Sequence, residues 1–397
     1  MLIRRLFTER QDIILRLTNL PFSRIIIKYD YFISRRIENH LQRDNRVIYR
    51  MKELSNNRIA ILERDSSNNY FIQIYNSLTW KIILIIPLLI PDVLMMSIMS
   101  DDKIVIANNK RMIVLDSNYG KVLYSLEVSN SGKIYELLPD KILFTGEYSE
   151  PVMIWTFGKD LLKISDSYIS FFKSGNSFLK LPDQKFILLL NDPGPVIYDF
   201  NGNFIESLPI PDIIQTSSEN YYDDIISLPN GHIIYSIRLN STDDIYLVQV
   251  NITTKVITKI IHPPSERFSS MYPISNNEIF YLTVNPIFKE YRITSFKSAL
   301  NILDLNYTDN ISINLSTSST IHTDIIGYLP DNRVIIYEKL GGTSSKIFHI
   351  VDMESFSKIS FPIELLRNVI KGAFPLIILR DGRILYLSAD NIISMIE

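Results

Sequence analysis

The sequence has no cysteine among its 397 residues. Disulfides, zinc sites with thiolate ligands and thiol nucleophiles are therefore excluded together. A chain that uses no disulfide is typical of a reducing compartment, so we expect a cytoplasmic protein.

Glycine and histidine are also scarce. With 13 glycines, the chain contains no glycine-rich nucleotide loop, no G-x-S-x-G nucleophile motif and no EF-hand loop. The five histidines, at positions 40, 232, 262, 322 and 349, show none of the short spacings of a metal site. The sequence therefore predicts no metal, no cofactor and no catalytic residue.

Three pairs of adjacent aspartates are candidates for acid–base catalysis. The pairs are Asp101 with Asp102, Asp223 with Asp224, and Asp243 with Asp244. An acid–base site needs carboxylates that converge, whereas adjacent aspartates are typical of turns. We expect all three pairs in solvated turns, and we predict that the protein is not an enzyme.

Long uninterrupted apolar runs are absent as well. Residues 1–7 contain no uninterrupted apolar region before Glu9, Arg10 and Asp12, so we expect no secretion signal and a protein that is not secreted. The longest apolar stretch, residues 82–99, contains two prolines and an aspartate and is at the short end for a spanning helix. We interpret it as two buried strands of neighbouring repeats joined at a proline-marked corner, and we expect no membrane span.

Charge is nearly balanced but unevenly distributed. The formal net charge is -2, yet residues 1–46 hold ten Lys and Arg against five Asp and Glu. Cations scattered among Ile and Leu are typical of the solvated face of helices, so we expect no nucleic-acid partner. The hydrophobic content of 46% and the charged content of 21% indicate a globular chain with a large core.

A short unit recurs eight times after residue 46. It consists of an apolar strand, a turn of Pro, Asn, Asp or Gly, and a second apolar strand, at residues 54–59, 99–104, 138–142, 181–186, 228–233, 274–279, 329–334 and 379–384. These turn residues between β-prone runs predict eight hairpins. Their mean spacing is about 46 residues, which is the length of a four-stranded propeller blade.

A second hairpin follows most of the first ones, as four strands per blade require. These hairpins are expected at residues 112–124, 196–208, 245–260, 300–315 and 347–361. The eighth copy has room for three strands, so a strand from the other end of the chain is expected to cover its open edge. The predicted fold is all-β: a single closed β-propeller of about eight blades over residues 47–397, with seven as the alternative, behind a short helical or mixed N-terminal segment, residues 1–46.

Residues 152–162 carry a resemblance to a known family. Their sequence, VMIWTFGKDLL, resembles the third-strand end of a WD repeat, with Thr156 where that family prefers aspartate. The resemblance covers residues 47–397 as architecture. It implies a WD-repeat-like β-propeller that binds other proteins.

Two interpretations fit the N-terminal segment equally. Thr8 and Gln11 have capping-box spacing and predict a first helix, and the residues Phe22, Ile25, Ile26 and Tyr29 fall on one face of a second helix. Residues 25–31 also fit the strand that closes the eighth blade.

Leu20 and Pro21, followed by this apolar stripe, resemble the opening of an F-box. Together with a repeat domain, the segment is similar to the F-box-like propeller proteins of large DNA viruses. The resemblance implies that Leu20, Pro21, Ile25 and Ile26 contact the adaptor of a cullin ubiquitin ligase, with Tyr29 on the same face. In a viral protein the compartment would be the host cytoplasm or the virion. The simpler alternative is that these residues pack under the propeller.

Three irregular segments are predicted as loops on one face of the propeller. They are residues 217–224, 262–268 and 285–292, and the last is an insertion that lengthens one repeat. Aromatic and arginine side chains suit interface anchors, so the candidates for partner binding are Tyr221, Tyr222, Phe268, Phe288, Tyr291 and Arg292. Ordinary loop variation is the alternative for each.

The sequence favours a non-catalytic protein–protein interaction scaffold, with an F-box-like substrate adaptor as its specific version. The alternative is a structural component of a virion or other large assembly, with capsid proteins as partners. A propeller hydrolase or lyase is a third class, and it needs clustered carboxylates or histidines at the mouth of the central channel.

Overall fold

The computed structural model describes most of the chain after residue 46 and one short segment before it. The described residues are 34–36, 47–93, 95–128, 132–145, 151–159, 161–165, 177–190, 192–212, 220–239, 244–261, 268–273, 278–289, 292–304, 310–314, 320–329, 333–340, 346–353, 358–363, 376–387 and 393–396. Strands dominate them, as the all-β prediction requires. Among these residues, none of the helices has the length and apolar character needed to cross a bilayer.

Five four-stranded antiparallel sheets follow one another along the chain. The first sheet comprises β2 (Val47–Leu54), β3 (Arg58–Arg64), β4 (Tyr70–Asn76) and β5 (Ile82–Leu88). The second comprises β6 (Met95–Ile98), β7 (Ile104–Ala107), β8 (Arg111–Leu115) and β9 (Val122–Glu127), and the third β10 (Ile134–Leu138), β11 (Lys141–Thr145), β12 (Val152–Thr156) and β13 (Leu161–Ser165). The fourth comprises β14 (Phe178–Leu181), β15 (Lys185–Leu189), β16 (Pro195–Asp199) and β17 (Phe204–Ser207), and the fifth β18 (Asn220–Ser227), β19 (His232–Leu239), β20 (Ile245–Asn251) and β21 (Val256–Ile261).

An eight-stranded sheet and a last four-stranded sheet complete the described fold. The eight strands are β22 (Phe268–Pro273), β23 (Glu278–Lys289), β24 (Arg292–Asp304), β25 (Asn310–Asn314), β26 (Thr320–Leu329), β27 (Arg333–Leu340), β28 (Lys346–Asp352) and β29 (Lys358–Ile363). Two sets of four join at a single residue pair between β24 and β26. The last sheet holds β30 (Leu376–Ile378), β31 (Ile384–Leu387), β32 (Ile393–Ile396) and β1 (Ser34–Arg36).

The predicted hairpins are confirmed. All eight turns connect antiparallel strand pairs, from β2 with β3 in the first sheet to β30 with β31 in the last. The five predicted second hairpins are also present, as β8–β9, β16–β17, β20–β21, β24–β25 and β28–β29. Turn chemistry explains this success, because Asn56, Asn57, Asp183 and Gln184 all take the positive φ angles that such tight turns require.

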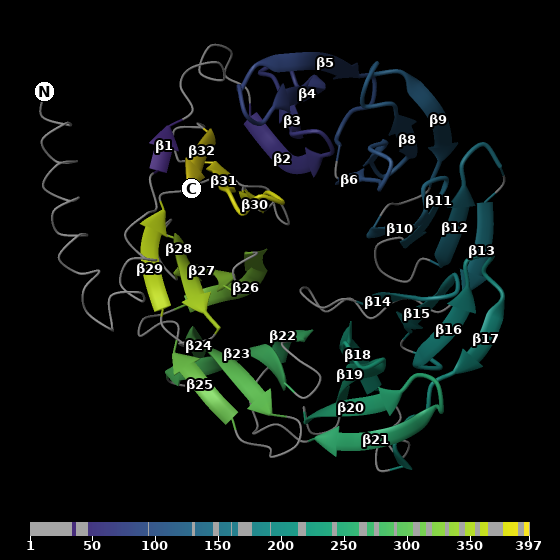
Figure 1. Ribbon diagram of the computed structural model, residues 1–397, viewed down its shortest axis with the longest axis vertical. Helices are drawn as coiled ribbons and strands as arrows, with labels where there is room; N and C mark the ends of the chain where they lie inside the picture. Colours follow the sequence, from purple (N-terminus) through teal and green to yellow (C-terminus); the bar gives the residue numbers. More distant parts are fainter. Residues whose placement is uncertain are drawn as a thin grey trace, which may run out of the picture.

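The sheets are arranged around a ring. In Figure 1 the first strand of each four-stranded sheet lies nearest the centre and the fourth lies at the rim, and the two halves of the eight-stranded sheet are arranged in the same way. Inner strands of several neighbouring sheets contact each other, such as β14 with β18 and β26 with β30, and β2 contacts β6 on one side and β30 on the other. This is the arrangement of strands in a β-propeller.

The N-terminal segment contributes a strand to the last sheet. β1 pairs antiparallel with β32, so that Ser34 lies opposite Ile396 and Arg36 opposite Ser394. We expected a strand from the N-terminal segment to complete the last repeat, which has three strands of its own. The predicted position was residues 25–31, whereas the strand lies at Ser34–Arg36. Residues 25–31, and both predicted helices, lie outside the described part of the chain.

The core lies between the sheets. β7 and β15 are buried along almost their whole length, because a middle strand of a blade packs on both faces against neighbouring sheets. One apolar cluster joins the first and second sheets through residues such as Leu62 and Ile104. Another joins the first sheet to the last, with Ile59 and Ile61 against Leu379 and Leu385.

The predicted interpretation of residues 82–99 is partly confirmed. They form β5 and β6, which belong to neighbouring sheets, with the corner at residues 89–93. The expectation that both strands are buried is wrong for β5, where Ile82, Ile83 and Ile85 are exposed. The reason is that β5 is the outermost strand of its sheet, so its side chains have fewer neighbours to cover them.

Two of the acidic pairs differ from the expected solvated turns. Asp224 lies inside β18 and is fully buried. Asp102 does lie in a turn, but it is buried between the first two sheets. It accepts hydrogen bonds from the backbone N–H of Ser55 at 2.8 Å, from the Ser55 hydroxyl, and from Arg58 Nη2 at 2.7 Å.

In three of the repeats, the basic residue that follows the repeated turn forms a hydrogen bond with the neighbouring sheet. Arg58 also donates from Nη1 to Asn118 Oδ1 of the second sheet at 2.8 Å. Lys141 Nζ lies 3.1 Å from Asn201 Oδ1 of the fourth sheet, and Arg383 Nη1 donates to the Ser77 carbonyl of the first sheet at 3.0 Å. At these three positions the residue after the repeated turn therefore links neighbouring sheets.

The Asp102 carboxylate predicts a contribution to acid sensitivity. Burial raises the pKa of Asp102, but hydrogen bonds from Ser55 and Arg58 outweigh burial and hold the pKa below its ordinary value. A carboxyl with a lowered pKa stabilises the fold above its unfolded-state pKa, and this contribution is lost as the pH falls through the folded-state pKa. Asp102→Asn is therefore expected to make the free energy of unfolding fall less steeply between about pH 4 and pH 2.

Urea unfolding of the wild type and Asp102→Asn at several acid pH values measures this slope. Asp140→Asn, at an exposed turn of the third sheet, serves as the matched control. The pKa values of Asp199 and Asp381 are also lowered, because hydrogen bonds within their own turns outweigh burial, so part of the slope is expected to remain. Equal slopes in the wild type and Asp102→Asn would contradict the assignment.

A candidate binding cleft on the rim

The candidate residues from the sequence are scattered. Leu20, Pro21, Ile25, Ile26, Tyr29 and Tyr291 lie outside the described residues. Phe268 begins β22, Phe288 lies near the end of β23, and Arg292 begins β24. The structure therefore places three of the candidates in strands of the eight-stranded sheet.

The loop predicted at residues 285–292 is wrong for the residues that the structure describes, 285–289 and 292. β23 runs to Lys289 and β24 starts at Arg292, and Asn285 pairs with Lys297 across the hairpin. The insertion lengthens two paired strands, because its residues include several with high β propensity that continue the pattern of the flanking strands. Its length alone therefore did not indicate a loop.

The loop predicted at residues 217–224 is also wrong over its described part. β18 begins at Asn220, and Tyr222 is 2% exposed and lies 6.4 Å from Tyr235, centroid to centroid. Burial raises the pKa of Tyr222 to about 12. Tyr222 is thus a core residue of the fifth sheet, whereas Tyr221 is partly exposed.

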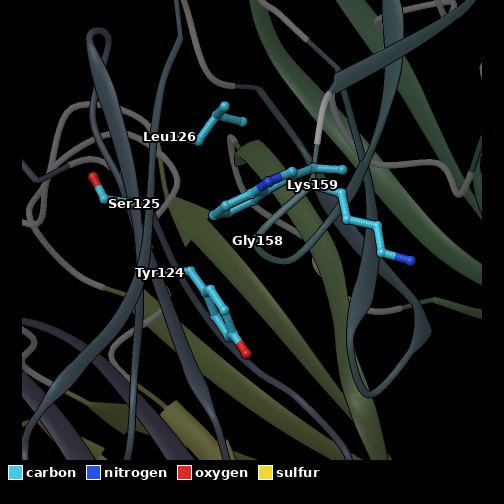
Figure 2. A pocket seen from close by; sticks show the side chains of 6 residues that line it. Tyr124, Ser125, Leu126, Gly158 and Lys159 are labelled. Atoms are coloured by element: carbon cyan, nitrogen blue, oxygen red, sulfur yellow. The ribbon is translucent and has the colours of Figure 1, made fainter.

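A cleft of about 570 Å³ lies elsewhere, between the outer strand of the second sheet and a turn of the third. Its lining residues are Tyr124, Ser125 and Leu126 of β9, Trp155 of β12, and Gly158 and Lys159 of the turn after β12. In Figure 2 the three β9 residues follow one strand, and Lys159 extends on the other side of the opening. The cleft is therefore built from two neighbouring sheets.

Aromatic side chains form the apolar part of the cleft. Tyr124 stacks on Phe157 at 5.5 Å between ring centroids, and Trp155 meets Phe157 edge-on at 5.0 Å. Gly158 has a φ of +73°, and a Cβ there would lie 3.2 Å from Cε1 of Tyr124. A glycine at this position lets the turn and the ring of Tyr124 come together.

Polar groups surround this aromatic part. Ser125 Oγ accepts a hydrogen bond from Nε of Arg111 at 2.7 Å. Lys159 is exposed, and its ammonium group forms no ion pair with any described residue. Tyr124 is 38% exposed. The cleft thus offers an aromatic surface beside a cation that is available to a ligand.

The described residues offer little for catalysis. No group of three or more His, Asp or Glu side chains within them is placed to hold a metal ion. The cleft itself contains a hydroxyl, a phenol and an ammonium group, but no carboxylate or imidazole that would act as a base.

Sequence reasoning did not select any of the six lining residues as a site. Trp155 lies at the end of the third strand of its sheet, as its resemblance to a WD repeat implies. A usable signal was the exposed aromatic Tyr124 on an outer strand, since outer strands border solvent. Tyr124 lies close to the turn after β12 because the two sheets pack together. No local pattern in the sequence indicates this proximity.

No protein-family model and no curated protein sequence matches the chain. Solved structures do. The C-terminal WD40 domain of Sif2 has a TM-score of 0.59 at 10% identity, and BamB from Moraxella catarrhalis has 0.56 at 12%, each over 92% of this chain and 98% of the other. The dihydro-heme d1 dehydrogenase NirN has 0.53 at 10%, over 83% of this chain and 75% of the other. Identities this low carry information about the fold alone, and that fold is a WD-repeat-like β-propeller.

Proposed function

We propose that the protein is a non-catalytic protein-interaction scaffold that holds a partner at the cleft between β9 and the turn after β12. The observation that carries the proposal is the exposed ring of Tyr124, which packs on Phe157 and lies next to the available cation of Lys159. Tyrosine is a frequent anchor in interfaces. The dehydrogenase among the similar structures means that the fold alone does not decide between a scaffold and an enzyme.

The proposed scaffold is a closed propeller of eight blades over residues 47–397, with residues 1–46 as a separate segment that contributes β1. The pairing of β1 with β32 and the contact of β2 with β30 support closure. The eight-stranded sheet supports the count of eight, because one residue pair is all that joins its two sets of four strands.

Two specific versions of the scaffold remain proposals. In the first, Leu20, Pro21, Ile25 and Ile26 bind a ubiquitin-ligase adaptor in the host cytoplasm, and the propeller recruits a target. In the second, the protein is a structural component of a virion. The rim cleft is compatible with both, because each requires a protein partner.

Purification of the full chain under mild conditions tests the scaffold. We expect proteins to co-purify in a fixed ratio with the chain and to be identified by mass spectrometry, at levels above those with an unrelated propeller that carries the same tag. An adaptor with a cullin would support the first version, and capsid proteins would support the second. Recovery of the chain alone, from cells that express its natural partners, would contradict the scaffold.

A further inference from the structure

The cleft lies against an open sheet edge. β9 is the last strand of the second sheet, and its described pairing is with β8. Alternate residues of such a strand direct their backbone N–H and C=O groups away from the sheet. Successive side chains of a strand point to opposite faces, so a cleft that contacts Tyr124, Ser125 and Leu126 together lies along the edge itself.

The rim around this edge is basic. Lys110, Arg111, Lys121 and Lys159 are all exposed, whereas Glu127 is the one acidic residue of β9. Glu127 lies opposite Arg111 in the register of β8 and β9. Lys121 and Lys159 form no ion pair within the described part of the chain. The surface therefore favours an anionic partner.

We infer that the cleft takes an extended acidic segment of a partner protein, which adds as a fifth strand to β9. Backbone groups of the segment pair with the open edge, an acidic side chain binds Lys159, and an apolar side chain covers Tyr124. An extended chain fits better than a compact ligand, because it alone satisfies a row of backbone groups. The inference rests on the proposed scaffold function and identifies the partner chemistry of the same site.

Selection of random peptides of about ten residues, displayed on phage, against the full chain tests this inference. We expect the selected peptides to be rich in Asp and Glu that alternate with apolar residues. Fluorescence polarisation with a labelled selected peptide then measures affinity. Lys159→Glu is expected to weaken binding by about tenfold or more, because it replaces an attraction with a repulsion.

Two matched controls separate the cleft from general charge and aromatic effects. Lys81→Glu reverses an exposed lysine at the turn before β5, and Tyr119→Ser removes an 81% exposed tyrosine outside the cleft. Each is expected to change affinity by less than about twofold. Tyr124→Ser is expected to weaken binding clearly, with an unchanged urea midpoint showing that the variant is folded.

Backbone pairing has its own test. Methylation of alternate backbone nitrogens in the selected peptide removes N–H donors on one edge, and one of the two possible patterns is expected to weaken binding by about tenfold or more. Peptides without an acidic excess, equal affinity for the wild type and Lys159→Glu, or tolerance of both methylation patterns would each overturn the inference.

If cellular partners co-purify with Lys159→Glu as with the wild type, the scaffold stands and this inference fails. If neither peptides nor proteins bind, both fail.

Discussion

Leu385→Ala is expected to lower the free energy of unfolding by about 2–5 kcal/mol, the usual range for a buried leucine. Leu385 lies in β31 and is completely buried in the cluster that joins the last sheet to the first. Its neighbours in this cluster include Ile59 and Ile61 of β3. The substitution leaves a cavity where the first and last sheets meet, so its cost includes both lost burial and lost packing.

Urea denaturation followed by circular dichroism measures this loss. Leu89→Ala provides the control, because Leu89 is 93% exposed and its truncation is expected to change stability by less than about 0.5 kcal/mol. A double variant with Ile61→Val should show a non-additive effect, since residues of one cluster share neighbours. A loss below about 1 kcal/mol for Leu385→Ala would mean that this cluster does not hold the two sheets together.

The second large effect is expected at Asp224. Its carboxylate is fully buried, and it accepts the N–H of Met271 in β22 at 2.6 Å and the N–H of Ile225 at 2.9 Å. It thereby connects the fifth sheet to the sheet that follows. Asp224→Ala leaves the Met271 N–H buried without this acceptor, so we expect a loss of about 3 kcal/mol in the free energy of unfolding.

Asp224→Asn distinguishes the hydrogen bond from the space that the side chain fills. Asparagine keeps one acceptor oxygen and nearly the same volume, so a smaller loss than for alanine is expected. Asp212→Ala, at an exposed position, is the control. Hydrogen exchange of the Met271 amide should accelerate in Asp224→Ala, and unchanged exchange together with unchanged stability would contradict this role.

The repeated hairpins were predictable because their signals are local. A turn such as residues 54–59 contains both the apolar runs and the asparagines that take positive φ, so neighbouring residues suffice to identify it. The same holds for residues 152–162, whose resemblance to a WD repeat agrees with their place in the third and fourth strands of the third sheet. Period and turn chemistry therefore carry most of the fold.

The binding surface was not predictable in this way. Tyr124 and Gly158 come together because two sheets pack side by side, and no spacing in the sequence measures that distance. Tyr222 was predicted to be an exposed interface residue but is buried. A tyrosine pair followed by two aspartates is typical of a loop, but these residues belong to β18, and Tyr222 and Asp224 are both buried there. Exposure depends on neighbours from other sheets, and the local pattern does not contain them.

The pairing of β1 with β32 has a consequence for the order in which the chain folds during synthesis. β1 leaves the ribosome well before its partner β32, because about 360 residues separate the two strands along the chain. At ordinary translation speeds the two are made roughly 20–70 s apart, which is long compared with the folding of single hairpins. The intervening sheets therefore have time to form before β1 finds its place. A nascent chain that stalls before residue 393 would leave β1 without its native partner and would be a natural substrate for chaperones.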